Sequence, residues 1–185
     1  MKTKDLALMA LFTALTAAGA FIRIPIPVLP FTLQFLFTTM AGLLLGPVRG
    51  ALSVLCYLVL GLIGLPIFSD GGGIFYVLQP TFGYLIGFLA GAFITGKIAH
   101  RANAPSFGRL LAACFAGLAV VYILGMAYYW LICTFYTKSG IGIGALFLYC
   151  FVLAVPGDIF LCFVSAIAAK RLYPVLIKNK KGVGL

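Results

Sequence analysis

The chain has 185 residues, of which 64% are apolar and only 9% are charged, and its mean hydropathy is +1.20. An ordinary soluble domain carries about 25% charged residues, so this composition excludes a water-soluble globular protein. The formal net charge is +10, but a nucleic-acid-binding surface needs a water-exposed basic face, which most of this chain lacks. The composition therefore predicts an all-α integral membrane protein that binds no nucleic acid.

Six apolar segments follow one another along the chain, separated by loops that are rich in proline, glycine or charge. A hydrocarbon core of about 30 Å needs roughly 20 apolar residues in a helix, and fewer where neighbouring helices shelter it. The predicted transmembrane helices cover residues 6–22, 31–45, 51–66, 81–98, 110–136 and 143–169. We expect a single membrane domain over residues 1–185, with a basic cytoplasmic tail over residues 173–185.

The distribution of lysine and arginine predicts the orientation of these helices. Both residues accumulate on the cytoplasmic side of a membrane protein. With the amino terminus inside, eleven of the thirteen basic residues fall in inner segments, and only Arg23 and Lys138 fall outside. Six crossings with both termini in the cytoplasm therefore fit the sequence best. The terminal basic residues are expected to contact anionic membrane lipid.

The first predicted helix carries a stripe of small residues. Ala10, Ala14 and Ala18 recur every four residues and lie on one face of a helix. Small residues at this spacing let two helix backbones approach closely in lipid. The stripe either packs against another helix of this chain or docks onto a second membrane subunit.

Polar side chains cluster in the predicted outer connections and at the adjoining helix ends. The cluster lies in the proline-rich hairpin after the first helix, and in and after the glycine loop that follows the third. Its members are Arg23, Thr32, Gln34, Tyr76, Gln79, Thr81 and Tyr84. Polar groups beside apolar and aromatic surface predict a small-molecule pocket. Any one of them could instead cap a helix or mark the membrane interface, where tyrosine is common.

Asp158 is the one acidic residue inside a predicted span. A charged side chain in lipid costs at least a few kcal/mol, so it is retained only where protein or water shelters it. The preceding Pro156 lacks an amide donor, and Gly157 allows another group to approach the backbone. This weakened turn predicts a substrate cavity at Asp158. The alternatives are a cap on a broken helix and a pairing with an arginine.

No catalytic or cofactor chemistry is indicated by the remaining residues. The five cysteines lie in apolar stretches without CxxC spacing, and the single histidine has no partner ligands nearby in sequence. Paired carboxylates, a Ser-His-Asp set and a phosphate-binding loop ending in Gly-Lys-Ser or Gly-Lys-Thr are all missing from the sequence. We therefore expect no metal, no cofactor and no enzymatic activity.

Several ordered motifs, spread over nearly the whole chain, resemble those of the BioY family. They are IPVLPFTLQ at residues 26–34, AGLLLGPVRGA at 41–51, GLIGLPIF at 61–68, GGG at 71–73, PTFGYLIGF at 80–88 and PGD at 156–158. BioY proteins are the biotin-specific substrate-binding subunits of energy-coupling factor (ECF) transporters. Several motifs in the same order are far more specific than any one of them alone.

The resemblance implies a six-helix subunit of the cell membrane that captures biotin from outside and delivers it inward. Two ATPase subunits would power uptake through a transmembrane scaffold subunit, which the stripe of Ala10, Ala14 and Ala18 would contact. The family's pattern implies that Asp158 and Gln79 contact the ureido ring of biotin. It also implies that the first loop and the region of Tyr84 close the pocket.

One position departs from the expected family pattern. A lysine is expected three residues after the aspartate, and this chain has Leu161 there. Arg23 or Lys138 could take the place of that lysine if the loops fold over the pocket. A related ligand, such as lipoate or dethiobiotin, therefore remains an alternative to biotin. A self-sufficient membrane carrier is the alternative of a different class.

Overall fold

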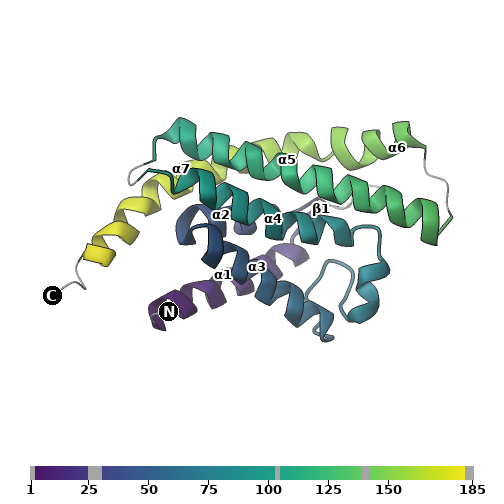
Figure 1. Ribbon diagram of the computed structural model, residues 1–185, viewed down its shortest axis with the longest axis horizontal. Coiled ribbons are helices and arrows are strands. Elements are labelled where there is room, and N and C mark those ends of the chain that lie inside the picture. The colour runs from purple at the N-terminus through teal and green to yellow at the C-terminus, as the bar shows by residue number, and fades with distance from the viewer. Residues whose placement is uncertain (1–2, 25–30, 103–104, 139–141, 182–185) are drawn as a thin grey trace.

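Long helices account for most of the computed structural model, which describes residues 3–24, 31–102, 105–138 and 142–181 (Figure 1). The helices are α1 (Thr3–Phe21), α2 (Gln34–Leu45), α3 (Pro47–Leu62), α4 (Phe82–Ala99), α5 (Phe107–Leu131), α6 (Ile143–Phe147) and α7 (Val155–Lys181). A 3-10 helix, η1 (Ile74–Leu78), precedes α4, and two π-helical segments, η2 (Ile132–Tyr136) and η3 (Leu148–Val152), continue α5 and α6. The expected all-helical fold is therefore confirmed.

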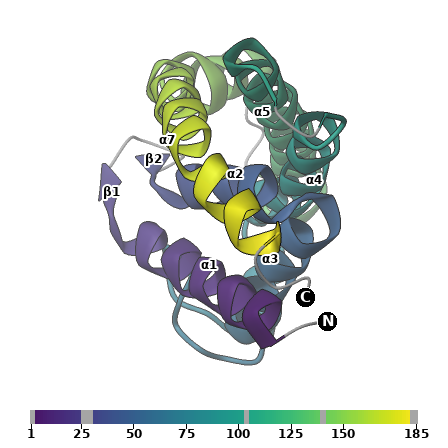
Figure 2. The same cartoon turned by 90° about the vertical axis from the view of Figure 1, so that its left-hand side faces the viewer.

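The short helix α2 lies at the centre of the bundle. It contacts α1, α3, α4, α5 and α7. Figure 2 shows this arrangement along the bundle, with α1 and α3 on one side of α2 and α5 and α7 on the other. Because α2 is surrounded by other helices, its backbone and side chains meet protein on most sides.

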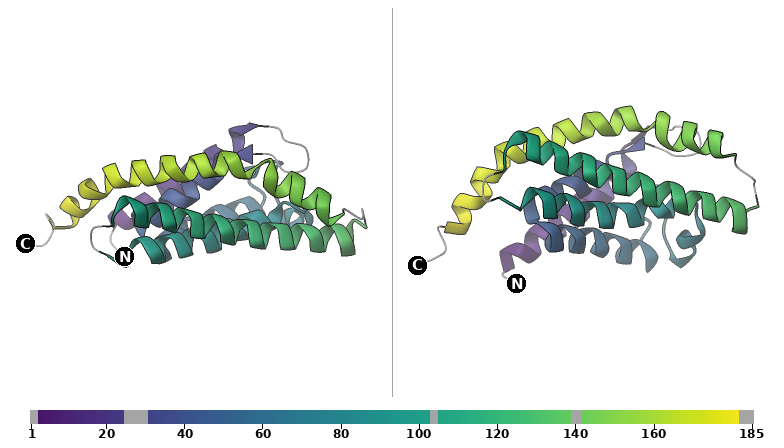
Figure 3. Two further views of the ribbon diagram at one scale, coloured as in Figure 1. Left: turned by 90° about the horizontal axis from the view of Figure 1, so that it is seen from above. Right: turned by 45° about the horizontal axis from the view of Figure 1, so that its top comes forward.

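The beginning of α1 and the end of α7 lie at the same end of the molecule. Figures 1 and 3 show the purple start of α1 and the yellow end of α7 there. The α3–α4 connection, residues 63–81, lies at the opposite end in both views. An even number of passes along the bundle accounts for this placement.

The first connection contains a short β-ladder. Strands β1 (Arg23–Ile24) and β2 (Phe31–Thr32) pair antiparallel, with Arg23 opposite Thr32. The second helix therefore begins at Gln34, later than the span expected from residue 31, because residues 31 and 32 are extended and hydrogen-bonded to β1. The proline-rich stretch, residues 25–30, lies outside the described residues.

Four helical stretches are long and apolar enough to cross a membrane. They are Thr3–Phe21, Phe82–Ala99, Phe107–Tyr136 and Gly144–Tyr173, whereas α2 and α3 are shorter apolar helices. With a rise of about 1.5 Å per residue, α2 extends only about 18 Å, which is less than a hydrocarbon core of about 30 Å. Six membrane crossings therefore remain a prediction for this chain.

Helices α4 and α5 form the most extensive helix–helix interface, and glycines make it possible. Gly87 and Gly91 on α4 face the backbone of α5. A Cβ atom at Gly87 would lie 2.9 Å from the Cα of Val121, and one at Gly91 would lie 3.1 Å from the carbonyl oxygen of Gly117. Such close backbone contact is the usual role of small residues spaced four apart in membrane helices.

Replacing Gly87 with alanine should lower the stability of the protein. The added methyl group meets the backbone of Val121, which cannot move without shifting α5, so we expect a loss of about 1–3 kcal/mol. Thermal unfolding of the detergent-purified protein measures this loss. Gly108→Ala is the matched control, because a Cβ atom there meets nothing within 4 Å. Equal melting temperatures for the two variants would show that the interface is looser than described.

Candidate functional site

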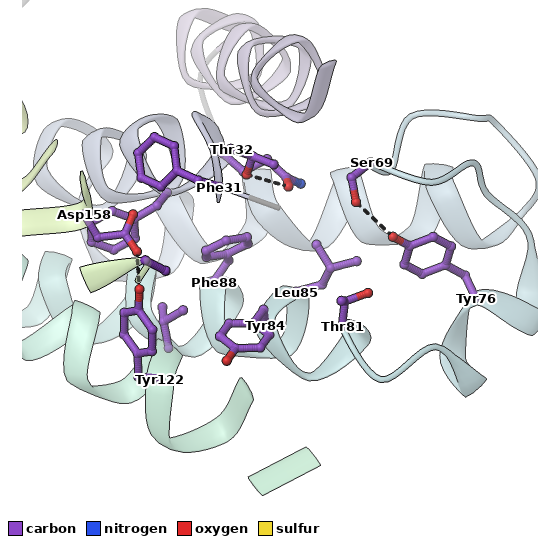
Figure 4. A pocket seen from close by; sticks show the side chains of 14 residues that line it. Phe31, Thr32, Ser69, Tyr76, Thr81, Tyr84, Leu85, Phe88, Tyr122 and Asp158 are labelled. Atoms are coloured by element: carbon purple, nitrogen blue, oxygen red, sulfur yellow. Dashed lines mark hydrogen bonds between the residues drawn. The ribbon is translucent and has the colours of Figure 1, made fainter. Parts of the chain in front are cut away.

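A pocket lies between the first connection, the α3–α4 connection and helices α2, α4, α5 and α7 (Figure 4). Its empty volume is about 580 Å³, including the part that is open to solvent. The lining residues are Phe31, Thr32, Gln34, Phe35, Ser69, Tyr76, Thr81, Tyr84, Leu85, Phe88, Val121, Tyr122, Ala154 and Asp158. A mainly apolar and aromatic lining with a few polar groups is typical of small-molecule sites.

A break in the last helical stretch places Asp158 in the pocket wall. The helix is interrupted by a turn at Leu153 and Ala154, and Asp158 lies in the first turn of α7. Pro156 is tolerated in that turn because its missing amide would have no helical partner there. Gly157 has no side chain where the ring of Phe31 packs, and a Cβ atom would collide with this ring. The expected close approach at Gly157 is therefore present, and Phe31 makes it.

The carboxylate of Asp158 is held by a tyrosine from another helix. The hydroxyl of Tyr122, on α5, donates a hydrogen bond of 2.5 Å to Oδ2 of Asp158. The ion pairs found among the described residues are Arg23–Asp70 and Arg49–Asp5, and neither includes Asp158. Within the described part of the chain, the alternative that an arginine pairs with Asp158 is therefore wrong.

A chain of buried and partly buried hydrogen bonds supports the wall formed by α2. The hydroxyl of Thr32 donates to Oε1 of Gln34 at 3.0 Å, and Nε2 of Gln34 donates to the Tyr57 hydroxyl at 2.7 Å. Tyr57 then donates to the carbonyl oxygen of Ile67 at 3.0 Å. Two pocket residues are thus connected through α3 to the α3–α4 connection.

At the surface, a second link joins the same two connections. Nη1 of Arg23 lies 2.8 Å from Oδ1 of Asp70 and donates to the carbonyl oxygen of Ser69, also at 2.8 Å. The hydroxyls of Ser69 and Tyr76 lie 3.1 Å apart, and both residues line the pocket. The side chains of Arg23 and Asp70 are about half exposed, 47% and 49%. An ion pair this exposed contributes at most about 1 kcal/mol.

Six of the eight residues from which the sequence predicts a small-molecule pocket line this one pocket: Thr32, Gln34, Tyr76, Thr81, Tyr84 and Asp158. Arg23 does not line it and instead pairs with Asp70. Gln79 is exposed and lies outside the lining. Tyr84 contributes its ring, because its hydroxyl donates to the carbonyl oxygen of Cys150 at 3.3 Å.

Tyr122 and the apolar part of the pocket lining are not among the residues predicted from the sequence. Tyr122 lies in the middle of an apolar helix and is only 4% exposed. A buried tyrosine hydroxyl usually has a hydrogen-bond partner, and this was the available signal. The sequence could not show that the partner was Asp158, because the two residues come from different helices.

The alanine stripe of α1 faces away from the rest of the protein. Ala10, Ala14 and Ala18 are all exposed, whereas Met9 and Phe12 on the opposite face are buried. The alternative that this stripe packs inside the chain is therefore wrong. The stripe is accessible to lipid or to a second protein.

Comparison with known proteins agrees with this architecture. The chain is 43% identical over 173 residues to the "Probable biotin transporter BioY" of Lysinibacillus sphaericus, covering 94% of this chain and 88% of that protein. It is 39% identical over 166 residues to the "Biotin transporter BioY" of Thermotoga maritima, with coverages of 88% and 91%.

Its fold is also similar to a solved structure, the "S-component for biotin from an ECF-type ABC transporter". That similarity has a TM-score of 0.77 at 28% identity and covers 93% of this chain and 94% of the other. A family model described as "BioY family" matches residues 1–178. The chain therefore belongs to the BioY family.

Proposed function

We propose that this protein is the substrate-capture subunit of an ECF-type uptake transporter and that it binds biotin in the pocket beside Asp158. The observation that carries this proposal is a mainly apolar pocket, inside an apolar helical bundle, with a carboxylate in its wall. The names of the relatives from Lysinibacillus and Thermotoga and of the solved S-component support biotin as the ligand.

The chemistry of biotin suits this lining. The ureido ring offers two N–H donors, and a carboxylate such as that of Asp158 accepts hydrogen bonds from them. The bicyclic body and alkyl chain are apolar, and the pocket presents Phe31, Phe88 and the ring of Tyr84 to them. Gln79 and Arg23 lie outside the lining, so their predicted contacts with ligand require the two outer connections to rearrange.

The protein is a multi-pass integral membrane protein of the cell membrane. Four helical stretches are long enough to span it, and we propose that α2 and α3 complete six crossings by lying among the longer helices. Both termini would then face the cytoplasm. The common end of the bundle at which α1 begins and α7 ends supports this topology (Figure 1), as does the excess of lysine and arginine in the inner segments.

Uptake by such a subunit needs partners. We propose a transmembrane scaffold subunit, contacted by the exposed stripe of Ala10, Ala14 and Ala18, and two ATPase subunits bound to that scaffold. Small exposed residues spaced four apart suit close contact with a partner helix in lipid.

Biotin binding to the detergent-purified protein is the first test. Calorimetric titration should give saturable, ATP-independent binding with one biotin per chain, and the Asp158→Asn variant should bind about tenfold to a hundredfold more weakly. This loss corresponds to about 1.5–3 kcal/mol for a hydrogen bond to a charged group. Saturable binding of lipoate and none of biotin would keep the transporter class and overturn the ligand. Unchanged affinity in Asp158→Asn would remove Asp158 from the site.

The topology can be tested by thiol labelling in intact cells. Phe75, in the α3–α4 connection, is 82% exposed, and Arg101, just beyond α4, is also exposed. A membrane-impermeant maleimide should label Phe75→Cys directly and Arg101→Cys only after permeabilisation. The wild-type chain with its five native cysteines sets the background. Labelling of both sites in intact cells would exclude the proposed orientation.

A bulky residue in the alanine stripe should block assembly. Ala14→Trp should prevent copurification of the scaffold subunit while leaving the affinity for biotin unchanged, since Ala14 is outside the pocket. Ile123→Trp is the matched control, because Ile123 is 66% exposed on α5 and away from the stripe. Intact assembly of Ala14→Trp would assign that face to lipid.

A further inference from the structure

We propose that Tyr122 is a positioning residue that orients Asp158, so that the pocket selects a ligand offering an N–H donor. This inference rests on the proposed function and assigns Tyr122 a role in its specificity. A cyclic urea such as that of biotin or dethiobiotin meets the requirement. The dithiolane ring of lipoate, which has no N–H group, does not.

The hydrogen bond from Tyr122 occupies one oxygen of Asp158 and leaves the other oxygen for a ligand. A phenol has one hydrogen to donate, and Tyr122 uses it on Oδ2 at 2.5 Å. Among the described residues, no hydrogen bond reaches Oδ1 of Asp158. The one fully buried polar side-chain atom without a partner there is Ser165 Oγ, so Oδ1 of Asp158 is not fully buried. Oδ1 therefore remains accessible in the pocket that Asp158 lines.

Tyr122 is held rigidly enough to fix this geometry. Its ring meets the edge of Tyr84 at 6.1 Å and 89°, and that of Phe151 at 5.2 Å and 77°. Gly125, one turn further along α5, leaves room for the ring of Tyr84, which a Cβ atom would obstruct. The hydroxyl of Tyr84 is in turn bonded to the backbone of Cys150.

The free oxygen then faces the ligand as an acceptor only. Leu161, one turn beyond Asp158 on α7, is buried and apolar, so it supplies no charge to balance the carboxylate. A ligand that places an N–H group against Oδ1 satisfies it. A ligand without a donor leaves a carboxylate oxygen unpaired in a pocket with few polar groups, and such sites discriminate strongly against the analogue that lacks the hydrogen-bonding group.

A double-mutant cycle tests whether Tyr122 acts through Asp158. Biotin affinity is measured by calorimetric titration for the wild type, Tyr122→Phe, Asp158→Asn and the double variant. Tyr122→Phe should weaken binding about tenfold when Asp158 is present. In Asp158→Asn, Tyr122 holds the amide oxygen and leaves the NH₂ group facing the N–H donors of biotin. Removing its hydroxyl there lets the amide turn, so we expect no further loss.

Two further measurements separate this role from a purely structural one. The ratio of biotin to lipoate affinity should fall in Tyr122→Phe, because the carboxylate is then free to turn away from the ligand. Tyr129→Phe is the matched control, since Tyr129 is a buried tyrosine of the same helix outside the pocket lining. It should change neither the affinity nor the ratio. Thermal unfolding of each variant reports on folding independently of ligand.

The outcomes distinguish this inference from the proposed function. A wild-type protein that does not bind biotin overturns the proposed function, and the selectivity assigned to Tyr122 with it. If the wild type binds biotin but the losses of affinity in Tyr122→Phe and Asp158→Asn add up in the double variant, only the role of Tyr122 is overturned. An unchanged affinity and ratio in Tyr122→Phe does the same. If Tyr122→Phe does not fold, an unchanged ratio in Tyr122→Leu, whose side chain has no hydrogen-bond donor, overturns the role.

Discussion

Polar atoms inside a bundle surrounded by hydrocarbon must find their partners within the protein, because lipid offers no hydrogen bonds. The helices of this chain follow the rule closely: Thr16, for example, donates to the carbonyl oxygen of Phe12 in its own helix. Among the described side chains, Ser165 Oγ is the one fully buried polar atom that lacks a partner. In the pocket, one acceptor is left for a ligand, because Tyr122 donates a hydrogen bond to only one oxygen of Asp158.

The shape of the bundle creates that place. Because α2 is short and central, the pocket at its first turn is lined by β2, by parts of the α3–α4 connection and by α4, α5 and α7. The close glycine-mediated contact of α4 with α5 brings the rings of Tyr84 and Tyr122 into an edge-to-face contact. Packing that looks purely structural therefore sets the position of the hydroxyl that orients Asp158.

The two outer connections are linked at two depths, with different consequences. The chain from Thr32 through Tyr57 to Ile67 is buried at its first two hydrogen bonds and partly buried at its last, and it holds one wall of the pocket. The exposed pair of Arg23 and Asp70 lies at the surface and contributes at most about 1 kcal/mol. If a ligand enters or leaves by breaking the Arg23–Asp70 pair alone, the pocket wall held by the Thr32–Tyr57–Ile67 hydrogen bonds stays in place.

The sequence by itself determined the class of protein, the approximate helices and the prediction of a cavity at Asp158, because hydropathy, breaks in apolar runs and a lone acid in a span are local features. It also identified five further pocket residues, Thr32, Gln34, Tyr76, Thr81 and Tyr84, which lie in short polar stretches beside apolar ones. Only the tertiary structure decided the partner of Asp158, 36 residues away, and the pairing of Arg23 with Asp70, 47 residues away. It also decided that the alanine stripe of α1 faces outward. Such pairings depend on which helix faces and loops meet, and no local pattern encodes that.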